Sequence, residues 1–177
     1  MAQILEYPEL NISKYVEKIN EMGNSLKIKI GQVKNSTYHI SMLNEYLFDE
    51  LGFDGAEEDY YDPGNSFLNV VLDKKTGIPI TLSIIYAEVA KSIGLNLQII
   101  GFPGHVIVKY KEEIILDPFY SGRLLTIEDL EEILTRNFGE VVEFVPEYLN
   151  ESTTDQLLTR LLRNLKNAYT QSDAYNN

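Results

Sequence analysis

Cysteine is absent from this chain of 177 residues, and only two histidines, His39 and His105, are present. Without a thiol the protein can form no disulfide, no thiolate metal site, no redox pair and no cysteine nucleophile. Acid–base chemistry near neutral pH is left with the two imidazoles as its main candidates. His39 lies among apolar residues of a predicted helix, without an acidic partner at a clear spacing, and is interpreted as a helix-surface residue.

Basic residues and long apolar runs are also scarce. Lys and Arg number 15 against 27 Asp and Glu, which gives a formal net charge of −12. Such a surface repels phosphate groups and anionic lipids, so we expect neither a nucleic-acid nor a membrane partner. The longest apolar stretches are interrupted well before the roughly 20 residues that a membrane span needs. Because no signal peptide is visible either, we expect a cytoplasmic protein.

The composition is that of a folded domain, with 44% hydrophobic and 24% charged residues. The length suits one domain, and neither a linker nor an internal repeat divides it. Predicted helices come first, strands follow, and helices end the chain. This order predicts a single α+β domain rather than a doubly wound sheet.

Helical spacing of apolar residues predicts six helices, each with candidate cap residues. They cover about 11–30 (cap Asn11 or Ser13), 36–51 (cap Ser36), 65–75 (cap Asn65 or Ser66), 79–93, 126–139 (capping box Thr126 and Asp129) and 153 onward (cap Thr153 or Thr154). Pro79 suits a first helical position and Gly94 a helix end. Since residues 80–93 are apolar on most sides, this helix is predicted to lie at the centre. The last helix is expected to pack through Leu158, Leu161, Leu165 and Ala168 or Tyr169.

Alternating residues predict strands over 95–99, 105–110, 114–117 and 141–145. The middle two form a hairpin whose turn decides where His105 lies. A three-residue turn at 111–113 pairs Ile107 with Asp117 and places His105 on the same face, diagonal to Asp117 and within reach of its carboxylate. A two-residue turn places the two on opposite faces. An assembled His105–Asp117 pair has the chemistry of a general base, or it only holds the hairpin together.

Four segments carry a resemblance to a known family: residues 62–68 (DPGNSFL), 77–83 (GIPITLS), 101–105 (GFPGH) and 117–119 (DPF). In this order they resemble the SirB-type branch of the transglutaminase-like superfamily. The resemblance implies a papain-like α+β core with a Cys-His-Asp triad, of which His105 and Asp117 match the second and third members. It also implies a cleft, whose expected residues are Asn65, Pro79, Thr81, Gly104, His105, Asp117 and Phe119.

The first member of the triad is missing. Counting back from Gly94 puts Pro79 at the helix start, where the superfamily has its cysteine. Thiol acyl transfer and thiol proteolysis are therefore excluded. Ser83 lies one helical turn further, on the same face but about 6 Å deeper, and is the substitute nucleophile if the protein is an enzyme. Alternatively Ser83 and Thr81 only bond backward within a buried helix, and Asn65 only caps its own helix.

The other charged residues give weaker evidence for a functional site. The acidic loop around Tyr60 and Tyr61 lacks the Gly and Glu positions of an EF-hand, so it is interpreted as solvated. We expect no metal and no cofactor. Arg123 is a candidate for holding an anion or for a surface ion pair.

Residues 151–177 resemble the opening of a tetratricopeptide repeat, following a transglutaminase-like domain over 1–150 that includes the N-terminal helices. About three repeats are needed for a stable array, so a single amphipathic helix packed on its own domain is the alternative.

Three functions follow from these observations. The first is a non-catalytic module that binds or scaffolds a protein or peptide. The second is a hydrolase or acyl-transfer enzyme that uses His105 and Asp117 with Ser83 or an activated water. The third is a regulatory protein acting through its acidic surface. Ligand identity and oligomeric state are left open.

Overall fold

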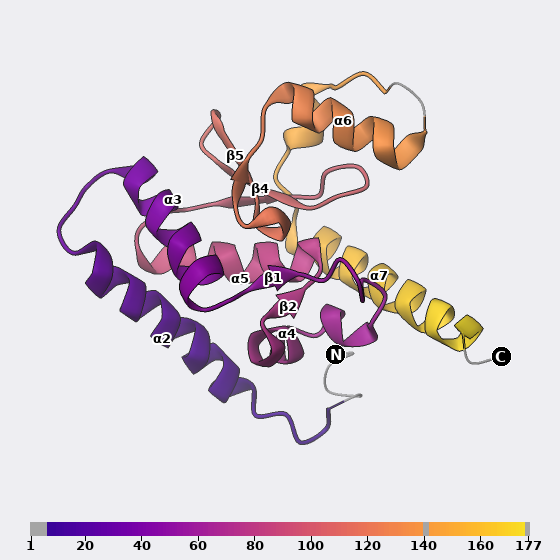
Figure 1. The fold of residues 1–177 in the computed structure, drawn as a ribbon, viewed down its shortest axis with the longest axis horizontal. Coiled ribbons are helices and arrows are strands. Elements are labelled where there is room, and N and C mark those ends of the chain that lie inside the picture. Colours follow the sequence, from indigo (N-terminus) through magenta and orange to yellow (C-terminus); the bar gives the residue numbers. More distant parts are fainter. Residues whose placement is uncertain (1–6, 140–141, 176–177) are drawn as a thin grey trace.

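The computed structural model describes residues 7–139 and 142–175. Its central helix α5 (Pro79–Ser92) lies between the N-terminal helices and a small antiparallel sheet (Figure 1). Helix α6 (Ile127–Phe138) covers the other face of that sheet, so the predicted α+β class is confirmed. Within the described ranges, no helix is both long enough and apolar enough to cross a membrane.

Two helices build the N-terminal layer. Helix α2 (Ile12–Ile30) begins at Asn11, whose side chain accepts the Lys14 amide at 3.2 Å, and packs on α5 through Met22, Leu26 and Ile30. Helix α3 (Ser36–Asn44) continues as a π-helical segment η1 (Glu45–Glu50). Its cap is Asn35 rather than the predicted Ser36, because the Asn35 side chain accepts the Tyr38 amide at 2.8 Å.

A parallel pair of very short strands ties two loops together. Strand β1 (Asp54–Gly55) pairs with β2 (Thr76–Gly77), which directly precedes α5. Between them lie a 3-10 turn η2 (Pro63–Ser66) and helix α4 (Leu68–Lys74). Asn65 does not cap α4: its side-chain amide instead donates to the Asp59 carbonyl at 2.7 Å and so holds the acidic loop.

The sheet is a meander in the order β3 (Gln98–Ile100), β4 (Ile107–Tyr110), β5 (Ile114–Asp117) and β6 (Arg123–Leu124). Tyr110 faces Ile114, so the three-residue turn is confirmed, and Lys111 enters it at a φ of 54°. Val108 and Leu116 point to α5, whereas Ile107 and Ile115 point to α6. The first strand begins three residues later than predicted. Residues 142–145 are irregular, so the strand predicted there is wrong, and Val141 lies outside the described residues.

Helix α6 begins with the predicted capping box of Thr126 and Asp129. After a 3-10 turn η4 (Pro146–Leu149), Ser152 pairs with strand β3, and helix α7 (Thr154–Tyr175) begins. Leu157 and Leu161 of α7 pack on Ile78 and Val106, and Ala168 is buried. The predicted packing face is wrong at Leu158, which is 53% exposed; the helix is rotated so that Leu157 takes its place.

Candidate functional site

His105 and Asp117 form a buried pair at one end of the sheet. His105 Nε2 lies 2.8 Å from Asp117 Oδ2, with the two side chains 8% and 1% exposed. The hairpin register brings them together as the sequence predicts, since Asp117 ends β5 and His105 precedes β4. An ionised carboxylate only accepts hydrogen bonds, so the imidazole donates from Nε2.

Asp117 is itself held from the backbone. Its Oδ1 accepts the Phe119 amide at 3.0 Å, which caps the 3-10 turn η3 (Pro118–Tyr120). The chain then returns through Ser121 and Gly122, both at positive φ, and the Gly122 amide donates to the Asp117 carbonyl at 2.8 Å. Both carboxylate oxygens are therefore occupied, and the carboxylate cannot rotate without losing one bond.

The second ring nitrogen of His105 is left for a ligand. With Nε2 protonated, Nδ1 carries a lone pair and acts as an acceptor. It has no hydrogen-bond partner in the described part of the chain and is not sealed from solvent. Phe119 meets the imidazole edge-on at 6.1 Å between ring centroids, and Tyr120 lies beside it at 6.4 Å. Both aromatic rings line the same cavity as His105.

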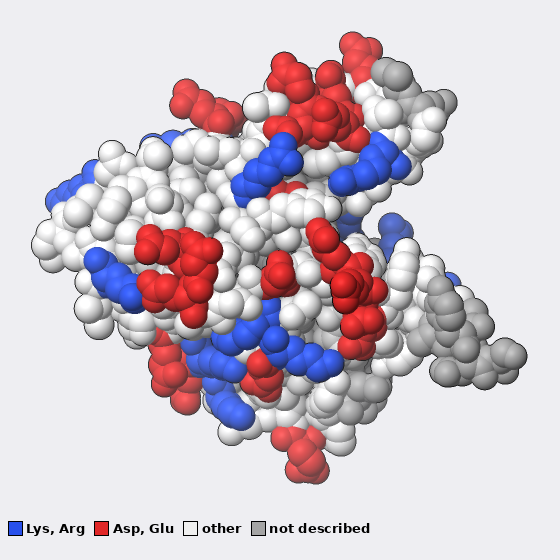
Figure 2. Space-filling view, in the orientation of Figure 1, with Lys and Arg blue, Asp and Glu red and all other residues white. Residues whose placement is uncertain are grey.

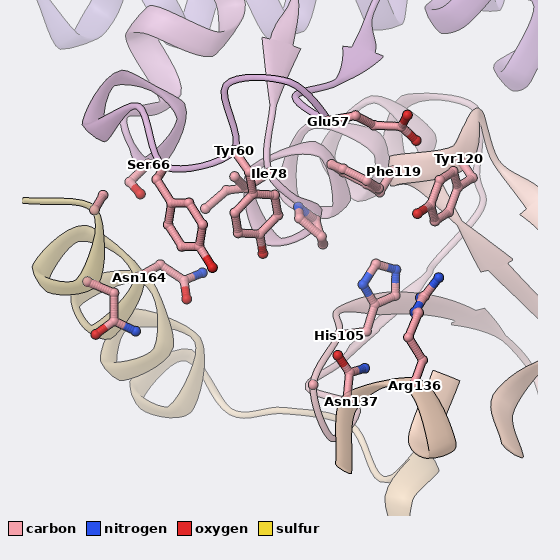
Figure 3. Close-up of a pocket in the computed structure, with 15 residues that line it drawn as sticks. Glu57, Tyr60, Ser66, Ile78, His105, Phe119, Tyr120, Arg136, Asn137 and Asn164 are labelled. Atoms are coloured by element: carbon pink, nitrogen blue, oxygen red, sulfur yellow. The ribbon is translucent and has the colours of Figure 1, made fainter. Parts of the chain in front are cut away.

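His105 lines a cavity of about 630 Å³, which we call the cleft (Figure 3). It lies between the acidic loop, the start of α5, the end of α6 and the inner face of α7. Its other lining residues are Glu57, Tyr60, Tyr61, Ser66, Ile78, Pro79, Gly104, Phe119, Tyr120, Arg136, Asn137, Asn164, Asn167 and Ala168. The mixture of aromatic rings, amides and few charges suits a ligand with both apolar and hydrogen-bonding groups.

Of the seven residues predicted for the cleft, four line it: Pro79, Gly104, His105 and Phe119. Asp117 lies behind His105. Thr81 does not line it, because its hydroxyl is fully buried and bonds Ile78 and the Asn65 carbonyl. Asn65 is likewise turned away, toward Asp59, and the neighbouring Ser66 takes its place on the wall.

Ser83 is also outside the cleft. Its side chain is fully buried in α5, and its hydroxyl faces the Val106 carbonyl at 3.5 Å. The greater depth expected from one helical turn puts it beneath the sheet. The position at the helix start is occupied by Pro79, whose ring offers no nucleophilic atom. Ser66 lies on the wall opposite His105 (Figure 3).

Gly104 brings the end of α6 against the loop before His105. Its φ is +76°, and a Cβ there would overlap the side chain of Asn137. Asn137 is fixed in turn, since its amide donates to the Ile133 carbonyl at 2.9 Å. Position 104 therefore requires glycine for two reasons: its positive φ and its close approach to Asn137.

The sequence missed the walls that come from the later helices. Arg136 and Asn137 of α6, and Asn164 and Asn167 of α7, reach the cleft only through tertiary packing. No motif marked them. Tyr60, which the sequence places only in the acidic loop, lines the cleft, and its partial burial raises the pKa of its hydroxyl above the usual value.

The remaining candidates have structural roles. The His39 imidazole lies 2.7 Å from the Val33 carbonyl, far from the cleft in sequence and absent from its walls. Arg123 forms an ion pair with Asp129, as one of the two interpretations held. Among the residues that the structure describes, no group of three or more His, Asp or Glu could hold a metal ion.

Comparisons with known proteins agree with this geometry. Residues 13–163 match the transglutaminase-like superfamily. A UPF0162 protein of Xylella fastidiosa (strain 9a5c) is 32% identical over 96% of this chain and 63% of its own. A UPF0162 protein of Vibrio cholerae is 27% identical over 73% of this chain and 49% of its own. Human F-box only protein 21 is 29% identical over 75% of this chain and 24% of its own.

The chain therefore spans less than two thirds of the length of these relatives. No solved structure matches it. The family match covers most of the sequence, although it ends within α7, before the cleft residues Asn164, Asn167 and Ala168. On this evidence the chain belongs to the transglutaminase-like superfamily.

Proposed function

We propose that the protein is a non-catalytic module that binds a peptide or protein segment in the cleft. The observation that carries this proposal is the content of the cleft: an ordered His105–Asp117 pair shares it with Pro79, at a helix start that offers neither thiol nor hydroxyl. Ser83, the substitute nucleophile, is buried away from it.

The Tyr60 hydroxyl does not replace the missing nucleophile. A phenol attacks readily only as phenolate, and the raised pKa of Tyr60 keeps it protonated at neutral pH. Binding, in contrast, needs only what the cleft has. Asn164 and Asn167 each offer a donor and an acceptor, the same pair that a peptide bond offers, and aromatic rings supply contact area at low entropic cost.

A second candidate is hydrolysis by an activated water, and the unoccupied Nδ1 of His105 favours it. A water bonded there would give its proton to Nδ1 while its oxygen attacks a carbonyl. The imidazolium formed in that step would be stabilised by Asp117, which is 2.8 Å away. This candidate needs no protein nucleophile.

One experiment separates the two. Pools of acetylated hexapeptides and of simple esters would be incubated with the wild-type protein and with His105→Ala, and both retention and product would be measured. We expect peptide retention without product in the wild type and weaker retention in the variant. Product formation that disappears in His105→Ala, with the melting temperature kept, would establish the hydrolase instead.

The acidic surface is the third candidate. Carboxylates gather in several patches on the face drawn in Figure 2, including the loop that borders the cleft. A partner held by these charges would bind less tightly as salt is added and would be indifferent to His105→Ala. A partner of the cleft would respond to the variant.

The finer family assignments are part of this proposal. The four motif segments support placement in the SirB-type branch. The 22 residues of α7 support a tetratricopeptide-like first helix, although its inner face is used here as a wall of the cleft.

A further inference from the structure

The cleft is continued by two further cavities. A cavity of about 880 Å³ shares Gly104, Asn164 and Asn167 with it, and runs along α7 toward η4. Another of about 250 Å³ shares Tyr120 and Arg136 with it, and lies between η3 and α6. We call the three together the groove. A ligand that occupies all three cavities must pass from η3 along α7 to η4, which an extended chain can do.

Arginine is confined to this groove. The sequence has four arginines and eleven lysines. All four arginines line the groove: Arg136 in the cleft, Arg160 and Arg163 toward η4, and Arg123 toward α6. No lysine is among the residues that line the three cavities in the described part of the chain. Figure 2 shows basic side chains inside the notch between the regions of α6 and α7.

The presence of arginine rather than lysine indicates the kind of ligand that the groove suits. Guanidinium is a planar fork that binds a carboxylate through two parallel hydrogen bonds, whereas an ammonium is a flexible point charge. Arg136, Arg160 and Arg163 form no ion pair with any acidic residue that the structure describes. Within the described ranges, Arg160 donates only to the Phe102 carbonyl, at 2.9 Å. The guanidinium groups of Arg136 and Arg163 therefore make no hydrogen bond or ion pair within the described part of this strongly acidic protein.

Arg136 is the one beside the His105–Asp117 pair. It rises from α6 next to His105 and Tyr120, whereas Glu57 lies at the opposite edge, above Phe119 (Figure 3). With one arginine and one glutamate, the cleft carries no net positive charge, and carboxylates also line the rest of the groove. A dianion such as a phosphate monoester would be repelled overall. A single carboxylate can still be bound, because the planar guanidinium of Arg136 can form two parallel hydrogen bonds with it.

Amides lie one step further along the groove. Asn164 and Asn167, spaced by three residues on α7, face both the cleft and the cavity toward η4. Neither side chain has a hydrogen-bond partner in the described residues. Paired donors and acceptors along one helix face match the N–H and C=O groups of an extended peptide.

We infer that the groove binds an extended peptide whose carboxylate is held by Arg136 in the cleft and whose neighbouring peptide groups bond Asn164 and Asn167. This inference rests on the proposed function and names its ligand class. The carboxylate belongs either to an Asp or Glu side chain or to a free C-terminus.

Three pools of random hexapeptides test it, all acetylated at the N-terminus. One has Glu fixed at the fourth position and an amidated C-terminus, the second has Gln there instead, and the third has no fixed residue and a free C-terminus. Retention on immobilised protein would be measured for the wild type, Arg136→Gln, Arg136→Lys and Lys111→Gln. The last variant removes one positive charge at the hairpin tip, outside the groove.

We expect the wild type to retain one carboxylate pool about tenfold better than the Gln pool, as one charge-assisted hydrogen-bond pair provides. The pool that is enriched identifies the source of the carboxylate. Arg136→Gln should abolish the preference, Arg136→Lys should restore it only in part, and Lys111→Gln should leave it intact.

Equal retention of all three pools, unchanged by Arg136→Gln, would overturn the inference while leaving a peptide-binding cleft. Failure of the wild type to retain any pool would overturn the proposed function as well. The ring protons of His105, followed by NMR, would report whether a retained peptide occupies the cleft.

Discussion

The Tyr86 hydroxyl donates a hydrogen bond of 2.6 Å to Asn44 Oδ1, and the Asn44 amide donates in turn to the Gly122 carbonyl at 3.0 Å. This chain of bonds crosses the core from α5 through the end of α3 to the loop that follows η3. The loop is the one that orients Asp117. The position of the carboxylate behind His105 is thus connected to the packing of the N-terminal helices.

Alkaline stability should depend on Tyr86. Burial raises the pKa of its hydroxyl well above the usual value. Between the pKa values of the unfolded and folded states the folded chain binds the extra proton, so stability is full below about pH 10 and falls as pH rises above it. Tyr86→Phe should weaken the fall in melting temperature between pH 9 and pH 11. An unchanged slope would contradict the assignment.

The same variant should lower stability at neutral pH. It leaves the partly buried Asn44 Oδ1 without its donor, which costs at most about 1–3 kcal/mol. Urea denaturation at pH 7 measures this cost. Tyr38→Phe is a suitable control, because Tyr38 is exposed on α3 and its loss should cost little.

Asp117→Asn should reverse the tautomer of His105. The Asn oxygen must still accept the Phe119 amide, so its NH₂ group is turned to His105 Nε2. Nε2 must then accept, and the proton moves to Nδ1. The ring ¹⁵N shifts should report a protonated Nε2 in the wild type and a protonated Nδ1 in the variant.

In Asp117→Asn, the Nδ1 atom of His105 would therefore be a hydrogen-bond donor instead of an acceptor. Binding that uses Nδ1 as acceptor should weaken in Asp117→Asn even if the fold is retained. If both proteins have the same tautomer, the carboxylate does not set the protonation of the ring. His39 provides the internal reference, since nothing in its surroundings changes.

Gly104→Ala should be more destabilising than Gly139→Ala. Both glycines have φ near +70°, at 76° and 71°, so both substitutions strain the backbone by about 1 kcal/mol or more. Only the Cβ at Gly104 would meet the Asn137 side chain; at Gly139 no atom of the described residues lies within 4 Å. Each variant lowers the free energy of unfolding, and the difference between the two losses measures the cost of the close approach to Asn137 alone. Equal values would show that α6 can move away.

Pro79→Cys should create a reactive thiol, and in a chain without cysteine this thiol is the only one to react. It would stand at the first position of α5, where the helix dipole favours a thiolate, in the cavity that His105 lines. Its alkylation by iodoacetamide at pH 7 should be several-fold faster than that of an exposed Ser121→Cys. Adding His105→Ala should slow the alkylation. An unchanged rate would show that the His105 imidazole does not act on a thiol at position 79.

The sequence predicted the parts of the site that depend on local structure. A three-residue turn fixes the register of one hairpin, and the register alone brings His105 to Asp117. Cap assignments were less reliable where two polar residues adjoin, as at Asn35 and Ser36, because either can bond the same amides. Asn65 was misassigned because its partner, Asp59, is set by the fold of a loop.

The walls of the cleft were not predictable in the same way. Arg136, Asn164 and Asn167 lie on amphipathic helices whose sequence marks one apolar face, and many polar residues share the other. Which of them face His105 depends on how α6 and α7 are rotated. The misplacement of Leu158 shows that an error of one residue in that rotation is enough to lose them.

Helix α7 also determines when the cleft exists. Its contacts join residues about 100 positions apart, so the wall forms only after the loop-closure entropy of most of the chain has been overcome. Few of the side chains described for α7 are fully buried, which places it among the elements that open locally before the core does. Amide exchange should therefore be faster in α7 than in α5. Each such opening removes one side of the cleft while the pair of His105 and Asp117 stays folded behind it.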